Sequence, residues 1–115
     1  MAGIEIHATS KNVRITPRKV RLVGDAVKGK GLTDAVALLR FMPHRASTVV
    51  LKTVRSAAAN AENNFDLDPN DLYVARVIVD PGRTLRRFRA KARGRVGPIR
   101  KRSSHVTVVV QEREA

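Results

Sequence analysis

"RTLRRFRAKARGRVGPIRKR", residues 83–102, decides how this chain is organised, because ten of its twenty residues are Lys or Arg and none is acidic. The cations repel one another, and the segment has few apolar side chains to bury. A strand-like pattern lies on each side of it, at 71–80 and at 105–113. We therefore predict that these two strands pair antiparallel and that the basic run is the extended end of a long β-hairpin. Something outside the chain must then neutralise its charge.

The flanking segments alternate as strands with one buried face do. In "HVTVVVQER" the apolar side is expected to consist of Val106, Val108 and Val110. In "DLYVARVIVD" strict alternation assigns one face to Tyr73, Ala75, Val77 and Val79, and the other to Val74, Arg76 and Ile78. A further strand is predicted at the sheet edge in "IEIHATS", residues 4–10, with Ile4, Ile6 and Ala8 on its apolar side.

A first helix is predicted over 17–28. Thr16 precedes it as a candidate N-cap, Pro17 suits the first helical position, and Gly29 can close the far end. Arg21 and Asp25 stand four residues apart on this helix, which favours a weak ion pair between them.

Two more helices are predicted before the strand at 71–80. The shorter one lies in "GLTDAVALLRFMP", with Thr33 as its cap and Pro43 as its stop. The longer one starts at Pro43 and runs through "PHRASTVVLKTVRSAAANAENN". Small or apolar residues recur three or four apart along it, at Ala46, Val50, Val54, Ala57 and Ala61.

These elements predict an α+β fold for residues 1–115 as a single domain. Three helices pack on a small three-stranded antiparallel sheet, and the basic hairpin 83–102 protrudes from it. With 43% hydrophobic residues the chain can build a core. Only three Phe, one Tyr and no Trp are present, so base stacking on aromatic rings is not the main binding device.

Several kinds of chemistry are excluded or disfavoured. The absence of cysteine excludes disulfides, thiol nucleophiles and thiolate metal sites. The three histidines, His7, His44 and His105, lack ligand spacing, and "DLDPND" has Asp71 where a calcium loop requires Gly. Ser103 and Ser104 beside His105 indicate hydrogen bonding at a strand start, because neighbouring strand residues point to opposite faces. No enzyme, metal or cofactor is expected, and no export signal or membrane span is found.

The charge distribution favours nucleic acid as the partner. The net charge is +13, of which +10 lies in 83–102, so the other 95 residues carry only +3. Eight of the ten cations are Arg, whose planar fork binds two phosphate oxygens at once. The predicted contacts of the hairpin are Arg83, Arg86, Arg87, Arg89, Lys91, Arg93, Arg95, Arg100, Lys101 and Arg102. A free, solvated tail is the alternative, and the internal position of the run argues against it.

The first helix offers a second, weaker candidate surface. Its cations are Arg18, Lys19, Arg21 and Lys28. They form either a secondary phosphate-binding surface or an ordinary solvated helix face.

Residues 91–110, "KARGRVGPIRKRSSHVTVVV", resemble the C-terminal signature of the bacterial large-subunit ribosomal protein twenty-two family. In that signature a basic residue, a small residue and a basic-Gly-basic triplet precede a His and an alternating apolar strand. The resemblance extends to "TPRKVRLVGDAVKGK" at 16–30 and "SAAANAENN" at 56–64. It therefore covers nearly the whole chain.

The resemblance implies a structural, RNA-binding constituent of the cytoplasmic ribosome. Its partners would be the large-subunit ribosomal RNA, neighbouring ribosomal proteins and the nascent peptide, with a monomer when free. It also implies that the protein supports early assembly and that the hairpin tip, Arg93, Gly94 and Arg95, lines the nascent-peptide exit tunnel. The alternative is a DNA-bending architectural protein with a β-ribbon arm, because such arms also carry Arg, Gly and Pro.

Overall fold

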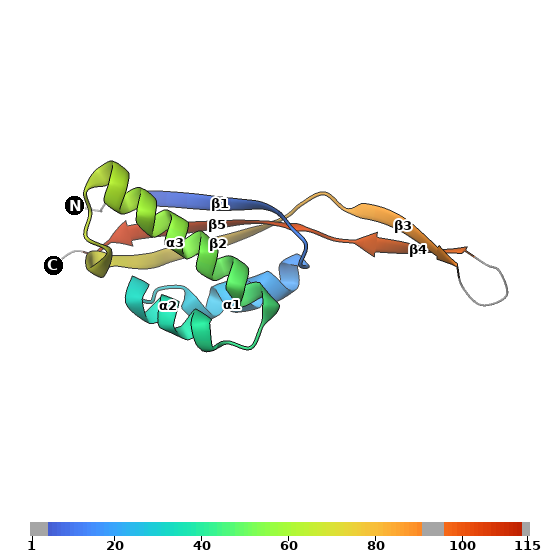
Figure 1. The fold of residues 1–115 in the computed structure, drawn as a ribbon, viewed down its shortest axis with the longest axis horizontal. Helices are drawn as coiled ribbons and strands as arrows, with labels where there is room; N and C mark the ends of the chain where they lie inside the picture. Colours follow the sequence, from blue (N-terminus) through green and yellow to red (C-terminus); the bar gives the residue numbers. More distant parts are fainter. Residues whose placement is uncertain (1–4, 91–95, 114–115) are drawn as a thin grey trace.

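The computed structural model describes residues 5–90 and 96–113, and of residues 85–90 and 96–101 it describes the backbone. Three helices and a three-stranded antiparallel sheet make an α+β fold, as predicted (Figure 1). The elements in chain order are β1 (Glu5–Val13), α1 (Pro17–Val27), α2 (Leu32–Phe41), α3 (Arg45–Phe65), the 3-10 turn η1 (Pro69–Asp71), β2 (Leu72–Pro81), β3 (Leu85–Ala90), β4 (Val96–Lys101) and β5 (Ser104–Glu112). None of the described helices is both long and apolar enough to cross a membrane.

β5 is the central strand of the sheet, in the order β1–β5–β2, and both of its neighbours are antiparallel to it. Its Val106, Val108 and Val110 are completely buried, which confirms the predicted face. β1 is an edge strand, as predicted, and its Ile6 and Ala8 are also buried. The last strand of the chain therefore supplies the centre of the core.

The predicted faces of β2 are wrong for its first half. The pairing with β5 shifts between Val74 and Arg76, which is a β-bulge at Ala75. The extra residue reverses the alternation, so Val74 is buried on the same side as Val79. Strict alternation had placed these two valines on opposite faces.

The helices cover one side of the sheet (Figure 1). α3 packs along β1 and β5, α1 packs along β2, and α2 packs against α3. The small and apolar positions predicted for the longest helix are all buried, namely Ala46, Val50, Val54, Ala57 and Ala61. Their spacing forms one apolar stripe, and the small residues in it allow α3 to lie close to the sheet.

The first helix begins at the predicted residue and ends at Val27, one residue before the predicted 28. α1 begins at Pro17, and Gly29 after its end has φ +81°, which favours glycine. Thr16 precedes the helix, but its side chain makes no capping bond. Its backbone carbonyl accepts hydrogen bonds from the amides of Lys19 and Val20 instead.

The predicted starts of the other two helices are wrong. α2 begins at Leu32 with Gly31 at the N-cap, two residues before the predicted cap Thr33. Gly31 forms a bridge with Tyr73 of β2, so tertiary pairing sets this boundary. α3 begins at Arg45 and not at Pro43, because the connection before it is extended at His44.

β3 and β4 pair antiparallel in a regular register from Leu85↔Lys101 to Ala90↔Val96. In Figure 1 this two-stranded ribbon continues the line of β2 and β5 beyond the helices. Residues 82–84 and 102–103 interrupt the strands, and the Gly82 amide donates to the Ser103 carbonyl across the break (2.8 Å). The molecule is elongated, with extents of 66 × 25 × 20 Å.

Candidate nucleic-acid interface

The body is hollowed at the end from which the β3–β4 ribbon leaves it. This hollow has a volume of about 1140 Å³. Three connections meet around it: residues 14–16 between β1 and α1, residues 42–44 between α2 and α3, and the interruption between the sheet and the ribbon. Five cations line the hollow, namely Arg14, Lys19, Arg45, Arg83 and Arg102.

The described ionisable side chains that line the hollow are all basic ones. None of the described residues that line it is acidic, and His44 is the remaining ionisable one. The one ion pair found between described residues, Arg76 with Glu5 at 2.7 Å, lies elsewhere. The five cations are thus uncompensated by the described part of the chain, and an anion is the ligand they favour.

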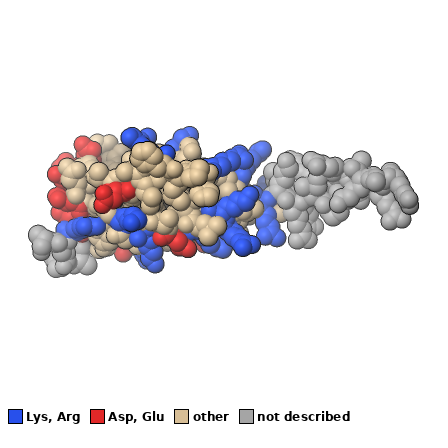
Figure 2. All heavy atoms as spheres, turned by 90° about the horizontal axis from the view of Figure 1, so that it is seen from below, with Lys and Arg blue, Asp and Glu red and all other residues tan. Residues whose placement is uncertain are grey.

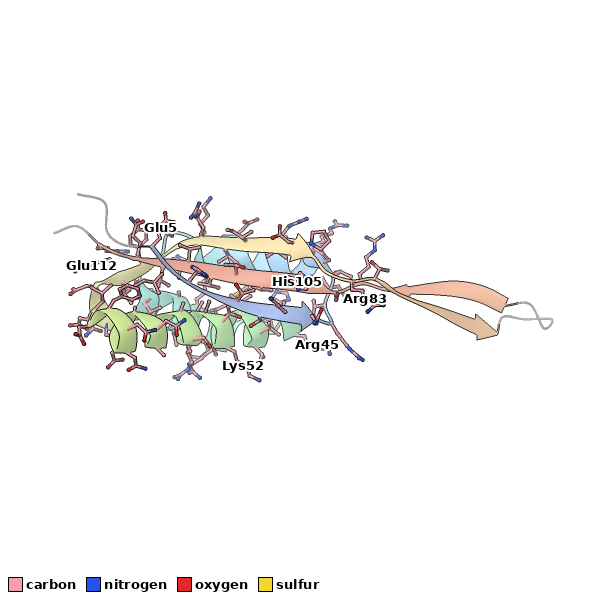
Figure 3. The ribbon with its side chains drawn as sticks, turned by 90° about the horizontal axis from the view of Figure 1, so that it is seen from above. Glu5, Arg45, Lys52, Arg83, His105 and Glu112 are labelled. Carbon is pink, nitrogen blue, oxygen red and sulfur yellow. The ribbon has the colours of Figure 1, made fainter. Side chains whose placement is uncertain are left out.

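Charge is also separated along the molecule. In Figure 2 the Lys and Arg side chains gather around the end of the body next to the ribbon, and Asp and Glu are concentrated toward the other end. Figure 3 shows the same separation in labelled residues, with Arg45 and Arg83 at the ribbon end and Glu5 and Glu112 at the opposite end. A polyanion is therefore attracted to one end of the body.

Buried serines hold the walls of the hollow in place. The Ser104 hydroxyl donates to the carbonyl of Ile15 (2.6 Å), and the Ser103 hydroxyl donates to the carbonyl of Arg83 (2.7 Å). The Ser47 hydroxyl contacts the carbonyls of Met42 and His44. Each of the three connections is thus tied down by one buried side chain, which holds the backbone that borders the hollow.

The predicted hydrogen-bonding role of the segment 103–105 is confirmed. Ser103 and Ser104 bind backbone carbonyls, as described above, and the Nδ1 atom of His105 accepts a hydrogen bond from the amide of Asn12 (3.1 Å). Asn12 has φ +57° at an irregularity of β1, and it lines the hollow. His105 therefore supports the wall of the hollow.

The predicted α1 cations differ in their surroundings. Lys19 lines the hollow, and Arg18 is exposed beside it in the sequence. Arg21 donates from Nη2 to the carbonyl of Val79 (2.8 Å), so it docks α1 on β2 and does not form the predicted pair with Asp25. Lys28 follows the last residue of α1, about 16 Å along the helix from Pro17.

The structure describes the predicted ribbon cations to different extents. The side chains of Arg83 and Arg102 are exposed at its base and line the hollow. Along the backbone of β3 and β4 lie Arg86, Arg87, Arg89, Arg100 and Lys101. The remaining predicted residues, Lys91, Arg93, Gly94 and Arg95, lie outside the described residues.

Sequence reasoning missed two of the five cations in the hollow, Arg14 and Arg45. Arg14 lies in the connection before α1, Arg45 is the first residue of α3, and the two are 31 residues apart in the sequence. No local sequence pattern predicts that these two arginines line the same hollow, because their proximity depends on how α3 packs along β1.

The described residues show neither a metal-binding cluster nor an unsatisfied buried polar side chain. They contain no group of three His, Asp or Glu that could hold a metal ion. They also contain no buried side-chain nitrogen or oxygen without a hydrogen-bond partner. The acidic segment at 66–71 forms the turn η1, in which the Asp68 side chain accepts from the amide of Asn70 (2.9 Å).

Known proteins resemble the chain over nearly its whole length. Residues 8–111 match the family described as Ribosomal protein L22p/L17e. A large ribosomal subunit protein uL22 from Pediococcus pentosaceus is 55% identical over 107 residues, which cover 93% of this chain and 91% of that protein. Proteins of the same name from Clostridium novyi and Lacticaseibacillus casei are 54% and 52% identical, over 96% and 94% of this chain and 99% and 92% of theirs. The family match includes every residue that lines the hollow.

Proposed function

Because the chain belongs to the ribosomal protein L22p/L17e family, we propose that it is a structural constituent of the large ribosomal subunit that binds large-subunit ribosomal RNA. Its place in the cell is the ribosome of the cytoplasm. The observation that carries the RNA-binding part is the hollow at the ribbon base, where five cations meet without an acidic residue among the described lining. Phosphate groups are the natural ligands of such a cluster.

The β3–β4 register supports the same proposal. Arg86 and Arg100 are partners across the ribbon. Like charges at directly opposite positions destabilise a strand pair, and an external anion removes that penalty. The cations of 83–102 are therefore expected to supply most of the affinity, by releasing the counterions of the phosphates they neutralise.

The tip and the assembly role belong to the same proposal and rest on the family resemblance. Arg93, Gly94 and Arg95 lie outside the described residues. We propose that they line the nascent-peptide exit tunnel, that the protein supports early subunit assembly, and that it is a monomer when free. Its further partners are then neighbouring ribosomal proteins and the nascent peptide.

A DNA-bending protein with a β-ribbon arm is the alternative that the basic ribbon left open. The family match favours ribosomal RNA over DNA. The family is one of ribosomal proteins, and the described residues do not suggest a catalytic role.

Co-sedimentation with large ribosomal subunits at moderate salt tests the proposal. Wild-type protein is expected to sediment with the subunit, and a variant in which residues 83–102 are replaced by a two-residue turn is expected to remain in solution. Duplex DNA added as competitor should not displace the wild type. Failure of the wild type to sediment, or its displacement by DNA, would refute the ribosomal function.

Gly94→Val tests the tunnel part separately. Phosphate contacts along the rest of the ribbon are expected to retain most of the affinity, so incorporation into subunits should stay near normal. A β-branched residue between two arginines restricts the backbone and fills space at the tip. The response of translation to a stalling peptide should therefore change. If subunit occupancy by mass spectrometry falls and stalling per assembled ribosome does not change, the tip is only an RNA anchor.

A further inference from the structure

We propose that the hollow at the ribbon base binds an unpaired, unstacked nucleotide of the RNA, with the flanking phosphates on its cations and the base against its apolar lining. This inference rests on the proposed function and adds the kind of RNA structure that the protein recognises. It predicts that the protein distinguishes RNA with an unpaired base from a continuous duplex.

The size of the hollow suits a nucleotide. Its volume of about 1140 Å³ lies somewhat above the roughly 300–1,000 Å³ of pockets that enclose small organic ligands, so a nucleotide has room in it. A duplex keeps its bases stacked inside and presents mainly its backbone to such a site. Loops and bulges instead splay bases out, and proteins bind those bases in pockets.

The lining has an apolar part as well as a cationic part. Leu22 is 66% exposed, although it is a large aliphatic residue on a helix that also has a buried face. It lines the hollow together with Met42 and Pro43. A single exposed leucine is ordinary, but three apolar side chains from two separate segments, gathered among cations, form a surface for a flat apolar ligand.

The two parts of the lining are adjacent on α1. Lys19 and Leu22 are three residues apart, so they lie on the same side of the helix. An ammonium group and an apolar surface side by side match a phosphate and the base attached to it. Free phosphate or an acidic peptide would use the cations and leave Leu22 without a partner.

Hydrogen bonds from buried serines also hold the walls of the hollow in place. Ser104 holds the connection that carries Arg14, and Ser47 holds the connection that carries Met42 and Pro43. Ser103 holds the backbone of Arg83. A pre-organised site loses little conformational entropy on binding, which favours selective recognition of one nucleotide conformation.

The test uses full-length protein and three RNA stems measured by fluorescence anisotropy. One stem carries a single unpaired nucleotide, the second carries an abasic unit at the same place, and the third is fully paired. We expect the wild type to bind the first stem about fivefold more tightly than the other two, because only it supplies a base for an apolar surface. The abasic stem keeps the backbone geometry and separates base contact from flexibility.

Leu22→Ser should abolish that preference without changing the dependence of affinity on salt, because no charge is lost. Leu22→Ala is a second variant that keeps high helix propensity. Phe65→Ser is the matched control, since Phe65 is 46% exposed at the other end of α3 and does not line the hollow. It should keep the wild-type preference.

Several results would overturn the inference. One is that the wild type binds all three stems equally. Another is that the preference survives both Leu22→Ser and Leu22→Ala. A third is that the abasic stem and the base-bearing stem bind with equal affinity. Displacement of the RNA by polyglutamate at equal charge concentration would also overturn it, since the hollow would then be an unselective anion site. In all these cases the stems still bind, so the proposed function stands; if no stem binds at all, the proposed function itself fails.

Discussion

At the scale of single residues, buried hydroxyl groups hold the backbone connections around the hollow. Ser104 is completely buried, and its hydroxyl satisfies the Ile15 carbonyl at 2.6 Å. Ser47 and Ser103 are also buried and also bind carbonyls of connections. A buried carbonyl without a partner is costly, so these serines fix the path of the backbone around the hollow.

Ser104→Ala is expected to lower the free energy of unfolding by about 1–3 kcal/mol, because it leaves the Ile15 carbonyl buried without a partner. Urea unfolding followed by circular dichroism measures this change. Ser56→Ala is the control, because Ser56 is exposed on α3 and alanine favours a helix. Equal stability of the Ser104→Ala variant and the wild type would show that the bond is dispensable.

At the scale of elements, α1 is fitted to β2 through a glycine. A Cβ atom on Gly24 would lie 2.8 Å from Val77 Cγ1 and 3.0 Å from Val77 Cβ. Arg21 fastens the same helix to the carbonyl of Val79. The bulge at Ala75 turns Val77 toward α1, so the helix and the irregular strand depend on each other.

Gly24→Ala should destabilise the protein by up to about 2 kcal/mol. Overpacking costs about 1–3 kcal/mol, and the higher helix propensity of alanine offsets about 1 kcal/mol of it. Denaturant unfolding measures the change. In a Val77→Ala background the loss should be smaller, because the nearest clashing atom is gone. A gain in stability in the wild-type background would show that α1 tolerates a wider spacing from β2.

The ribbon and the body are expected to be separable elements. The described residues that form the core cluster all lie outside 83–102. Gly82 and Ser103 already face each other through a backbone hydrogen bond of 2.8 Å, the arrangement that a two-residue turn can close.

Replacement of residues 83–102 by Asn-Gly should leave cooperative thermal unfolding intact and change stability by about 1 kcal/mol, mainly through loss of the Ser103–Arg83 bond. RNA affinity should fall sharply in the same protein. Calorimetry and anisotropy measure the two effects. Non-cooperative unfolding would mean that the ribbon is part of the core after all.

At the scale of the whole molecule, charge is arranged along the long axis. The 66 Å axis ends at one side in the basic ribbon, and the body carries Glu5 and Glu112 near the other (Figure 3). If the protein binds RNA as proposed, this arrangement orients it on approach, with the hollow and the ribbon leading. Binding should therefore depend on where a cation lies and not only on how many there are.

The double variant Lys19→Ala, Arg45→Ala should reduce the slope of log affinity against log salt by about 1.4 to 1.8, if both residues contact phosphate. Arg76→Ala is the comparison, because Arg76 is compensated by Glu5 at 2.7 Å. It should leave the slope unchanged. A similar reduction in both proteins would indicate that only net charge matters and that the hollow has no special role.

The sequence by itself determined the kinds of elements, the α+β class and the concentration of charge. The period of Val106, Val108 and Val110 predicted a strand with one buried face, and Ala46, Val50 and Val54 predicted a helix stripe. These properties are local, because side-chain direction repeats within two to four residues. The family resemblance could also be seen in the sequence alone, because its signature consists of residue types at short, fixed spacings.

Only the tertiary structure decided which distant residues meet. The order β1–β5–β2 brings the hydroxyl oxygens of Thr9 and Thr107 to 3.0 Å from each other, although the two residues are 98 positions apart in the sequence. The bulge at Ala75 changes which face of β2 is buried. The hollow likewise joins Arg14 and Arg45 to the predicted Lys19, Arg83 and Arg102. Helical and strand periods carry no information on such long-range contacts, because these follow from how the apolar faces pack together.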